Sequence, residues 1–254
     1  MAILPKQRMK KLIFIILSFI TLTTFAQTKM RPIEELINTK DSGWPFVTEW
    51  IKSAKNKVEI LPVDNQKAKD ALYKTQVTTR SPMGSIIYET GGILIDNGWI
   101  RILGSGSEKL KRILPDWNLG KGFKDFGQPT TFLLVADDAI GGFFILNGGG
   151  LGNDLGKIYY FAPDNLEFEP LDLTYTEFLT FCFNNDLDEF YKGYRWKNWK
   201  EDVSKLKGDY VYNFVPYLWT KEGKDIENVS KKEVPIEEQY SLNLDFRKQL
   251  GINK

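Results

Sequence analysis

The residues that could carry out chemistry in this chain are carboxylates near the ends of predicted strands: Glu89, Asp96, Asp137 and Asp164. A glycosidase-type hydrolase needs two carboxyl groups about 5–10 Å apart in one cleft. Asp137 and Asp138 are adjacent in the sequence, and neighbouring residues on a strand point to opposite faces of the sheet. They are therefore not a ready-made pair, and no spacing selects two of the other acids. A carboxylate-based hydrolase remains an open alternative.

Histidine is absent from the 254 residues, and Cys182 is the one cysteine. The lack of histidine excludes Ser-His-Asp and Cys-His catalysis, His-liganded zinc and haem with a proximal histidine. Cys182 lies among phenylalanines in a predicted helix, where no histidine can lower the pKa of its thiol, and we interpret it as a small buried apolar residue. The sequence thus predicts neither a cofactor nor a metal ion.

Two glycine-rich loops could hold small ions. The loop from Asn147 to Asp154 could bind a cation through Asn147, Asn153 and Asp154, but it offers one carboxylate and does not match an EF-hand. A wide turn permitted by glycine is the favoured interpretation. The segment from Gly104 to Lys111 (GSGSEKLK) lacks the spacing of a phosphate-binding loop and is interpreted as a plain loop.

The strongest hairpin signal is Asn97-Gly98, which is typical of a two-residue turn. If these residues form the loop, Leu94 faces Arg101, and the mixed side of the hairpin also carries Asp96 and Trp99. Asp96 and Arg101 are then diagonal neighbours that could form an ion pair. This mixed side is either a recognition surface or is covered by a helix, and the covered alternative is favoured. The opposite, core-facing side carries Ile93, Ile95, Ile100 and Ile102.

A basic and aromatic cluster follows later in the chain, where Trp196 and Trp199 are interleaved with Arg195, Lys197 and Lys200. Such residues could stack on a sugar or a base. The edge of an amphipathic helix also explains this cluster, and it is the favoured interpretation.

The elements that must position these residues follow from periodicity and turn signals. Helices are predicted near 32–38, 44–54 and 64–74, and again near 174–183, 186–191, 199–206 and 239–250. Strands are predicted at 58–61, 85–89, on both sides of Asn97-Gly98, and at 131–136, 142–147, 157–161, 166–168 and 210–218. We therefore predict an α+β fold with a central, mostly antiparallel sheet of hairpins flanked by N-terminal and C-terminal helices. The mature chain, 27–254, is predicted to be one domain with its core at about 30–250.

The first 26 residues have the features of a signal peptide. Lys10 and Lys11 precede the apolar run from Leu12 to Ala26, which is shorter than the roughly 20 residues of a membrane-spanning helix. Cleavage after Ala26 would export the protein to the periplasm or outside the cell, and the run resembles signal peptides of Bacteroidetes-like Gram-negative bacteria. An uncleaved anchor is the alternative. No permanent membrane anchor is expected after cleavage.

The predicted mature chain has 30 basic and 33 acidic residues, because four of the 34 basic residues lie in the signal peptide. A net charge of −3 argues against nonspecific binding of nucleic acid, which requires a basic surface.

Several motifs resemble one bacterial family. They are Met30-Arg-Pro-Ile-Glu-Glu-Leu-Ile, Thr78-Thr-Arg-Ser-Pro-Met-Gly, Asp96-Asn-Gly-Trp-Ile-Arg, Leu134-Val-Ala-Asp-Asp and Tyr175-Thr-Glu-Phe-Leu. Together they resemble domain of unknown function 2625 over about residues 30–250, a family that implies no activity. The segment from Asp138 to Leu179 more loosely resembles the SMI1/KNR4 (SUKH) superfamily, which includes proteins that neutralise toxins. That resemblance implies a binding module without catalytic residues.

The sequence therefore favours an exported, non-enzymatic binding module, similar to an immunity protein, over an envelope hydrolase. Its partner is expected to be a protein or another envelope ligand. A binding module should expose an apolar or aromatic patch, whereas a hydrolase should have a pocket with two converging acids. The candidate binding residues are Asp96, Trp99, Arg101, Asp137, Asp138 and Asn147.

Overall fold

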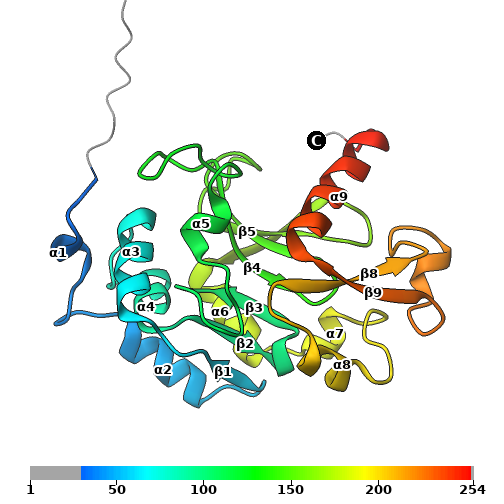
Figure 1. Ribbon diagram of the computed structural model, residues 1–254, viewed down its shortest axis with the longest axis horizontal. Helices are drawn as coiled ribbons and strands as arrows, with labels where there is room; N and C mark the ends of the chain where they lie inside the picture. Colours follow the sequence, from blue (N-terminus) through cyan, green and yellow to red (C-terminus); the bar gives the residue numbers. More distant parts are fainter. Residues whose placement is uncertain (1–29, 253–254) are drawn as a thin grey trace, which may run out of the picture.

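The computed structural model describes residues 30–252, so the predicted signal peptide lies outside the described residues. Its centre is a sheet of seven strands whose spatial order equals their order in the sequence, and every neighbouring pair is antiparallel (Figure 1). The strands are β1 (Val58–Ile60), β2 (Gly92–Ile95), β3 (Ile100–Leu103), β4 (Phe132–Asp138), β5 (Phe143–Asn147), β6 (Lys157–Phe161) and β7 (Phe168–Thr174). The predicted α+β class is confirmed.

Four helices precede or interrupt the first strands: α1 (Ile33–Leu36), α2 (Trp44–Lys52), α3 (Asn65–Thr75) and α4 (Pro82–Glu89). The prediction of a strand at 85–89 was wrong, because these residues form the second half of α4. The Ser81 side chain accepts a hydrogen bond from Gly84 N at 3.0 Å, and Pro82 occupies the first turn. Both features favour the start of a helix.

The hairpin of β2 and β3 has the predicted register, in which Leu94 pairs with Arg101. Its loop is wider than the predicted two-residue turn. Asp96, Asn97 and Gly98 all have positive φ, at 50°, 64° and 90°, and they form the 3₁₀ turn η1 (Asp96–Gly98). Asp96 therefore leaves the pleat of β2, and its side chain is not directed by the strand register.

The strand predicted at 131–136 extends two residues further than predicted, to include Asp137 and Asp138. Both belong to β4, where Asp137 pairs with Arg101 and Asp138 pairs with Ile100 on β3. The chain reverses over residues 139–142, where Gly141 has a φ of 83°. The strand therefore delivers two adjacent carboxylates to opposite faces of the sheet.

The last third is helical apart from one hairpin. The helix predicted near 174–183 is confirmed as α6 (Tyr175–Asn184), and a capping box of Thr174 and Glu177 opens it. The last third also contains α7 (Leu187–Phe190), α8 (Trp199–Lys205), β8 (Tyr210–Val215), η2 (Glu222–Lys224), β9 (Ser230–Pro235) and α9 (Ile236–Gln249). Earlier in the chain, α5 (Leu114–Asn118) lies between β3 and β4. In Figure 1 the β8–β9 hairpin and α9 lie at the opposite end of the molecule from α1–α4.

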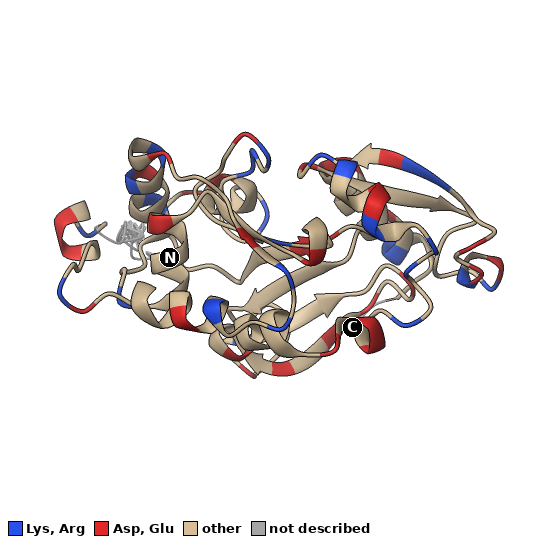
Figure 2. Ribbon diagram, turned by 90° about the horizontal axis from the view of Figure 1, so that it is seen from below, with Lys and Arg blue, Asp and Glu red and all other residues tan. Residues whose placement is uncertain are grey.

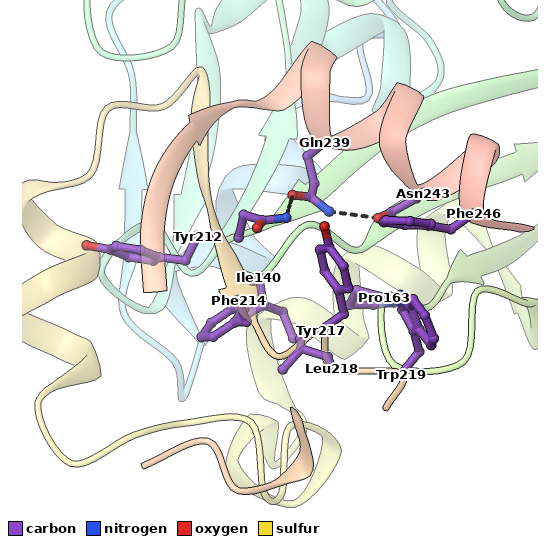
Figure 3. Close-up of a pocket in the computed structure, with 11 residues that line it drawn as sticks. Ile140, Pro163, Tyr212, Phe214, Tyr217, Leu218, Trp219, Gln239, Asn243 and Phe246 are labelled. Carbon is purple, nitrogen blue, oxygen red and sulfur yellow. Dashed lines mark hydrogen bonds between the residues drawn. The ribbon is translucent and has the colours of Figure 1, made fainter. Parts of the chain in front are cut away.

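The buried apolar side chains form one cluster that extends from Leu36 to Tyr240 and includes Cys182. Helix α9 is joined to this core by a chain of side-chain amides: Asn213 donates to Gln239 at 2.7 Å, and Gln239 donates to Asn243 at 2.7 Å (Figure 3). Asn243 then donates to the Gly141 carbonyl at 3.0 Å. Within residues 30–252, no helix has both the length and the hydrophobicity to span a bilayer.

Candidate functional site

Both faces of the β2–β3 hairpin are buried. Trp99 is 0% exposed and Arg101 is 2% exposed, so the mixed side is not an open recognition surface. Of the two interpretations that the sequence left open, the structure therefore supports the covered one. The cover comes from segment 191–199, whose rings pack against Trp99: Tyr191, Trp196 and Trp199 have ring centroids 5.2, 5.8 and 5.0 Å from that of Trp99.

Arg195 lies inside this aromatic group. Its guanidinium carbon is 4.0 Å from the ring centroid of Trp199 and 4.8 Å from that of Trp99. Its Nη2 atom is 2.8 Å from Asp96 Oδ2, so the predicted ion pair between Asp96 and Arg101 was wrong. Arg195 thereby holds the η1 turn against the aromatic group, with Asp188 as its second carboxylate partner at 2.5 Å.

Arg101 pairs instead with Asp137, its cross-strand neighbour. Arg101 Nη2 lies 2.6 Å from Asp137 Oδ1, and both side chains are almost completely buried. The guanidinium also donates to the carbonyls of Asp138, at 2.6 Å, and Tyr210, at 2.5 Å. Burial lowers the pKa of Arg101, and the charge of Asp137 opposes that effect. The contacts tie β3 to β4 and to the start of β8.

Asp137 has a second arginine partner, because Arg112 Nη1 donates to Asp137 Oδ2. Arg112 continues to Asp209, with Nε 3.1 Å from Oδ1, and it donates from Nη2 to the Gly208 carbonyl at 2.8 Å. The charges thus alternate along Arg101, Asp137, Arg112 and Asp209. This network fixes two loop segments, at 110–112 and 207–210, against the sheet.

Asp138 lies on the other face and is fully buried. Its Oδ2 accepts hydrogen bonds from the hydroxyls of Tyr160, at 2.7 Å, and Tyr191, at 3.1 Å, while Oδ1 accepts from the backbone of Ile140 and Gly142. Burial raises the pKa of Asp138, and these hydrogen bonds oppose the effect. A carboxylate with this many internal donors organises the turn after β4.

Asn147 lies apart from the other candidates and organises its own loop. Its Oδ1 accepts from Gly149 N at 2.7 Å and Leu151 N at 3.2 Å, and its Nδ2 donates to Asp154 Oδ1 at 3.0 Å. A hydrogen bond from Tyr159 lowers the pKa of Asp154 and raises the pKa of Tyr159 to about 12. Among the described residues, no group of three acids or cysteines could hold a metal ion.

The acids proposed for a hydrolase have different and unrelated partners. Asp96 pairs with Arg195, Asp137 lies between two arginines, and Asp164 accepts a hydrogen bond from the Tyr194 hydroxyl. Burial raises the pKa of Glu89, which lies at the end of α4. No two of these acids line the same one of the surface cavities described below.

A surface cleft of about 830 Å³ lies beside the hairpin, between β1, the loop at 108–111 and the segment that joins α8 to β8. Its size is within the usual range of ligand sites. Arg101 and Leu94 contribute to its floor, and we call it the basic cleft because five basic and three acidic side chains line it. The basic residues are Lys57, Arg101, Lys109, Lys111 and Lys207, and the acids are Glu59, Glu108 and Asp209.

Internal pairing leaves the cleft with free positive charge. Lys109 pairs with Glu59, and Asp209 pairs with Arg112. Three exposed lysines of the cleft form no ion pair with any described residue: Lys57, which donates to the Asn97 side chain, Lys111, and Lys207, which lies 5.5 Å from the Tyr210 ring centroid. Of the three acids that line the cleft, Glu108 is the one that forms no ion pair with a described residue.

The sequence interpretation did not identify these lysines, because they come from three separate segments. One signal was present: in Lys109-Leu110-Lys111 a buried leucine lies between two exposed lysines. Alternation of this kind places both lysines on the same side of an extended segment. Across the rest of the molecule, basic and acidic residues are interspersed along the same segments (Figure 2).

A small cavity between α9 and β8 is lined by Tyr217, Trp219 and Phe246 together with the amides of Gln239 and Asn243 (Figure 3). Its volume is about 10 Å³, which leaves room for about one water molecule. The amides are hydrogen-bonded to one another, so this cavity belongs to the packing of α9.

The chain is thus an α+β protein whose antiparallel sheet has its strands in sequence order, with the basic cleft beside the β2–β3 hairpin. By sequence, the chain belongs to the family described as "Protein of unknown function DUF2625", which matches residues 33–239. It is similar to an uncharacterized protein of Haemophilus influenzae, with 48% identity over 84% of this chain and 94% of the relative. It is also similar to the putative uncharacterized protein YbfG of Escherichia coli, with 44% identity over 85% of this chain and 99% of the relative. No solved structure matches the chain.

Proposed function

We propose that the mature chain is an exported, non-catalytic binding module, and that the basic cleft binds an anionic group of its ligand. The observation that carries this proposal is the set of unpaired lysines, Lys57, Lys111 and Lys207, around one cleft. Unpaired surface cations attract an anionic partner and increase its rate of association. The looser SUKH resemblance supports a protein ligand, as in toxin neutralisation.

The internal pairing of the acids supports binding rather than hydrolysis. A general acid needs a carboxyl group that can reach the substrate, and a hydrolase needs a second carboxyl group nearby. In the basic cleft, Glu59 and Asp209 are each paired with a basic side chain, which leaves Glu108. One exposed glutamate without a carboxyl partner does not meet this requirement.

The proposal is tested by titrating the mature protein with triglutamate, the anionic probe, at low ionic strength. Chemical shifts in NMR spectra report the binding. We expect saturable shifts at Leu94, Lys111 and Lys207, and we expect the double variant Lys111→Glu/Lys207→Glu to abolish them. Lys69→Glu/Lys248→Glu makes the same charge change at exposed positions outside the cleft and should bind normally. Absence of saturable binding would contradict the proposal.

Export is tested separately by the intact mass of the protein recovered after expression in a Gram-negative host. We expect a species that begins at Gln27 in the periplasm or medium. A chain that retains Leu12 to Ala26 in the membrane fraction would show that the segment is an uncleaved anchor.

A further inference from the structure

The basic cleft has a neighbour on the other side of the η1 turn. This second depression, of about 380 Å³, is lined by the same Lys57 and Asn97 that line the basic cleft, and also by Lys55, Arg195 and Lys200. Because two residues belong to both linings, the two hollows adjoin at the turn. We call the turn and Lys57 together the ridge.

The charges of the second depression follow the same pattern as those of the basic cleft. Arg195 engages Asp96 and Asp188, and the Asp186 side chain accepts a hydrogen bond from Glu189 N at 3.0 Å as the cap of α7. Lys55 and Lys200 form no ion pair with any described residue. Together, five exposed lysines therefore remain unpaired along both hollows: Lys55, Lys57, Lys111, Lys200 and Lys207.

The ridge between the hollows is held in place before any ligand binds. Three successive residues with positive φ form the turn. Arg195 forms an ion pair with Asp96, and Lys57 Nζ donates a hydrogen bond to the Asn97 side chain at 2.9 Å. A preformed surface loses less conformational entropy on binding than a flexible one. A long ligand can therefore use both hollows without first ordering the part between them.

We infer that the basic cleft and the second depression together bind one extended, acidic polypeptide segment of a partner protein, which crosses the ridge over Lys57 and Asn97. This inference rests on the proposed function, because it uses the same cleft. A small anion would fill one hollow and leave the lysines of the other unused. An extended chain gains about 3.3–3.6 Å per residue and can place carboxylates in both hollows.

The acids in the two linings favour a polypeptide over a nucleic acid. Glu108, Asp186 and Asp188 are exposed beside the lysines, and a regular row of phosphates would be placed close to them. A polypeptide can present polar or basic side chains at those points and acidic ones at the lysines. The net charge of −3 for the predicted mature chain also opposes a phosphate backbone.

The experiment compares triglutamate with a decapeptide of alternating glutamate and serine, by isothermal titration of the mature protein. The decapeptide should bind roughly a hundredfold more tightly, because its second contact is intramolecular. Lys55→Glu/Lys200→Glu should remove this gain, lowering decapeptide affinity by roughly a hundredfold to that of triglutamate, and should leave triglutamate unchanged. Lys111→Glu/Lys207→Glu should abolish triglutamate binding and weaken decapeptide binding, and Lys69→Glu/Lys248→Glu should weaken neither. All six lysines are exposed, and circular dichroism verifies that each variant folds.

The failures of the two proposals are distinguishable. If triglutamate binds through Lys111 and Lys207 but Lys55→Glu/Lys200→Glu leaves the decapeptide unaffected, the two-hollow segment is excluded and the anion-binding cleft stands. If neither probe binds, both proposals fail. A ten-nucleotide single-stranded DNA that binds more tightly than the decapeptide would exclude the polypeptide as occupant.

Discussion

Arg101 and Asp137 form a buried ion pair, with Nη2 and Oδ1 2.6 Å apart and neither side chain more than 2% exposed. Removing charges of this kind from water is costly, and the cost is compensated only while both partners are present. Asp137 also contacts Arg112, so one carboxylate neutralises two guanidinium groups. The two partners of the pair are therefore not equivalent.

We expect Asp137→Asn to lower the free energy of unfolding by roughly 3–5 kcal/mol, because it leaves two arginines without their shared carboxylate. Arg101→Met should cost less, about 1–3 kcal/mol, because Asp137 keeps Arg112 as its partner. Urea denaturation followed by circular dichroism gives both values. Equal costs, or the opposite order, would show that Asp137 is not the centre of the network.

Replacement of Trp99 should also destabilise the fold. Trp99 is fully buried among three aromatic rings and the Arg195 guanidinium, so Trp99→Ala should cost roughly 3–5 kcal/mol of unfolding free energy. Phe46→Ala is the matched control, since Phe46 is 60% exposed, and it should change stability by less than about 0.5 kcal/mol. A stable Trp99→Ala protein that loses its ligand would restore Trp99 to a recognition role.

Sequence reasoning predicted the features that depend on local signals. The register of Leu94 with Arg101 follows from the hairpin alone, and the helix predicted near 174–183 depends on residues close together in the sequence. The partners of Asp96 and Arg101 are not local: Asp96 contacts Arg195, and Arg101 reaches Tyr210, 109 residues away. Nothing in one sequence specifies which distant residues will meet.

The basic cleft could not be predicted for the same reason. Its lysines are ordinary surface residues in their own segments, and the cleft exists because the network of Arg101 and Arg112 brings segments near 110 and 208 together.

The prediction of a strand at 85–89 was wrong for a different reason. Apolar residues in a short run suit either a strand or a helix, and here the start signals at Ser81 and Pro82 decide for the helix.

Asp138 should make stability depend on pH. Burial raises the pKa of Asp138 above its ordinary value of 3.8, so the folded state binds this proton more tightly than the unfolded state does. Its contribution to stability therefore falls as the pH rises from 3.8 through the folded pKa. Asp138→Asn removes this titration. We expect it to cost about 1–3 kcal/mol near pH 4, because the donors lose an acceptor, and to cost less at higher pH.

Urea denaturation of the wild type and Asp138→Asn at several pH values measures this effect. The difference in unfolding free energy between the two proteins should shrink as the pH increases. A difference that grows with pH would show that the hydrogen bonds from Tyr160 and Tyr191 outweigh burial and lower the pKa of Asp138.

Asn147 should control the order of the loop at 148–156. Asn147→Ala leaves the backbone amides of Gly149 and Leu151 without their acceptor, so we expect faster proteolysis within this loop. Asn153→Ala is the control, because the Asn153 side chain forms no hydrogen bond with any described residue. Melting temperatures should be the same with calcium and with a chelator, and a drop of several degrees on chelation would reveal a cation in the loop.

The order of the strands has a consequence for how the chain acquires its structure. Each of the seven strands pairs with its neighbours in sequence, so the sheet can grow strand by strand as the chain emerges from a ribosome or a membrane pore. The charge network of Arg101, Asp137, Arg112 and Asp209 cannot form strand by strand in this way. Arg101 meets its carboxylate only when β4 has formed, and Arg112 meets Asp209 later still. The basic cleft is thus completed after the sheet, and nascent chains that end before about residue 210 would contain the sheet without the binding site.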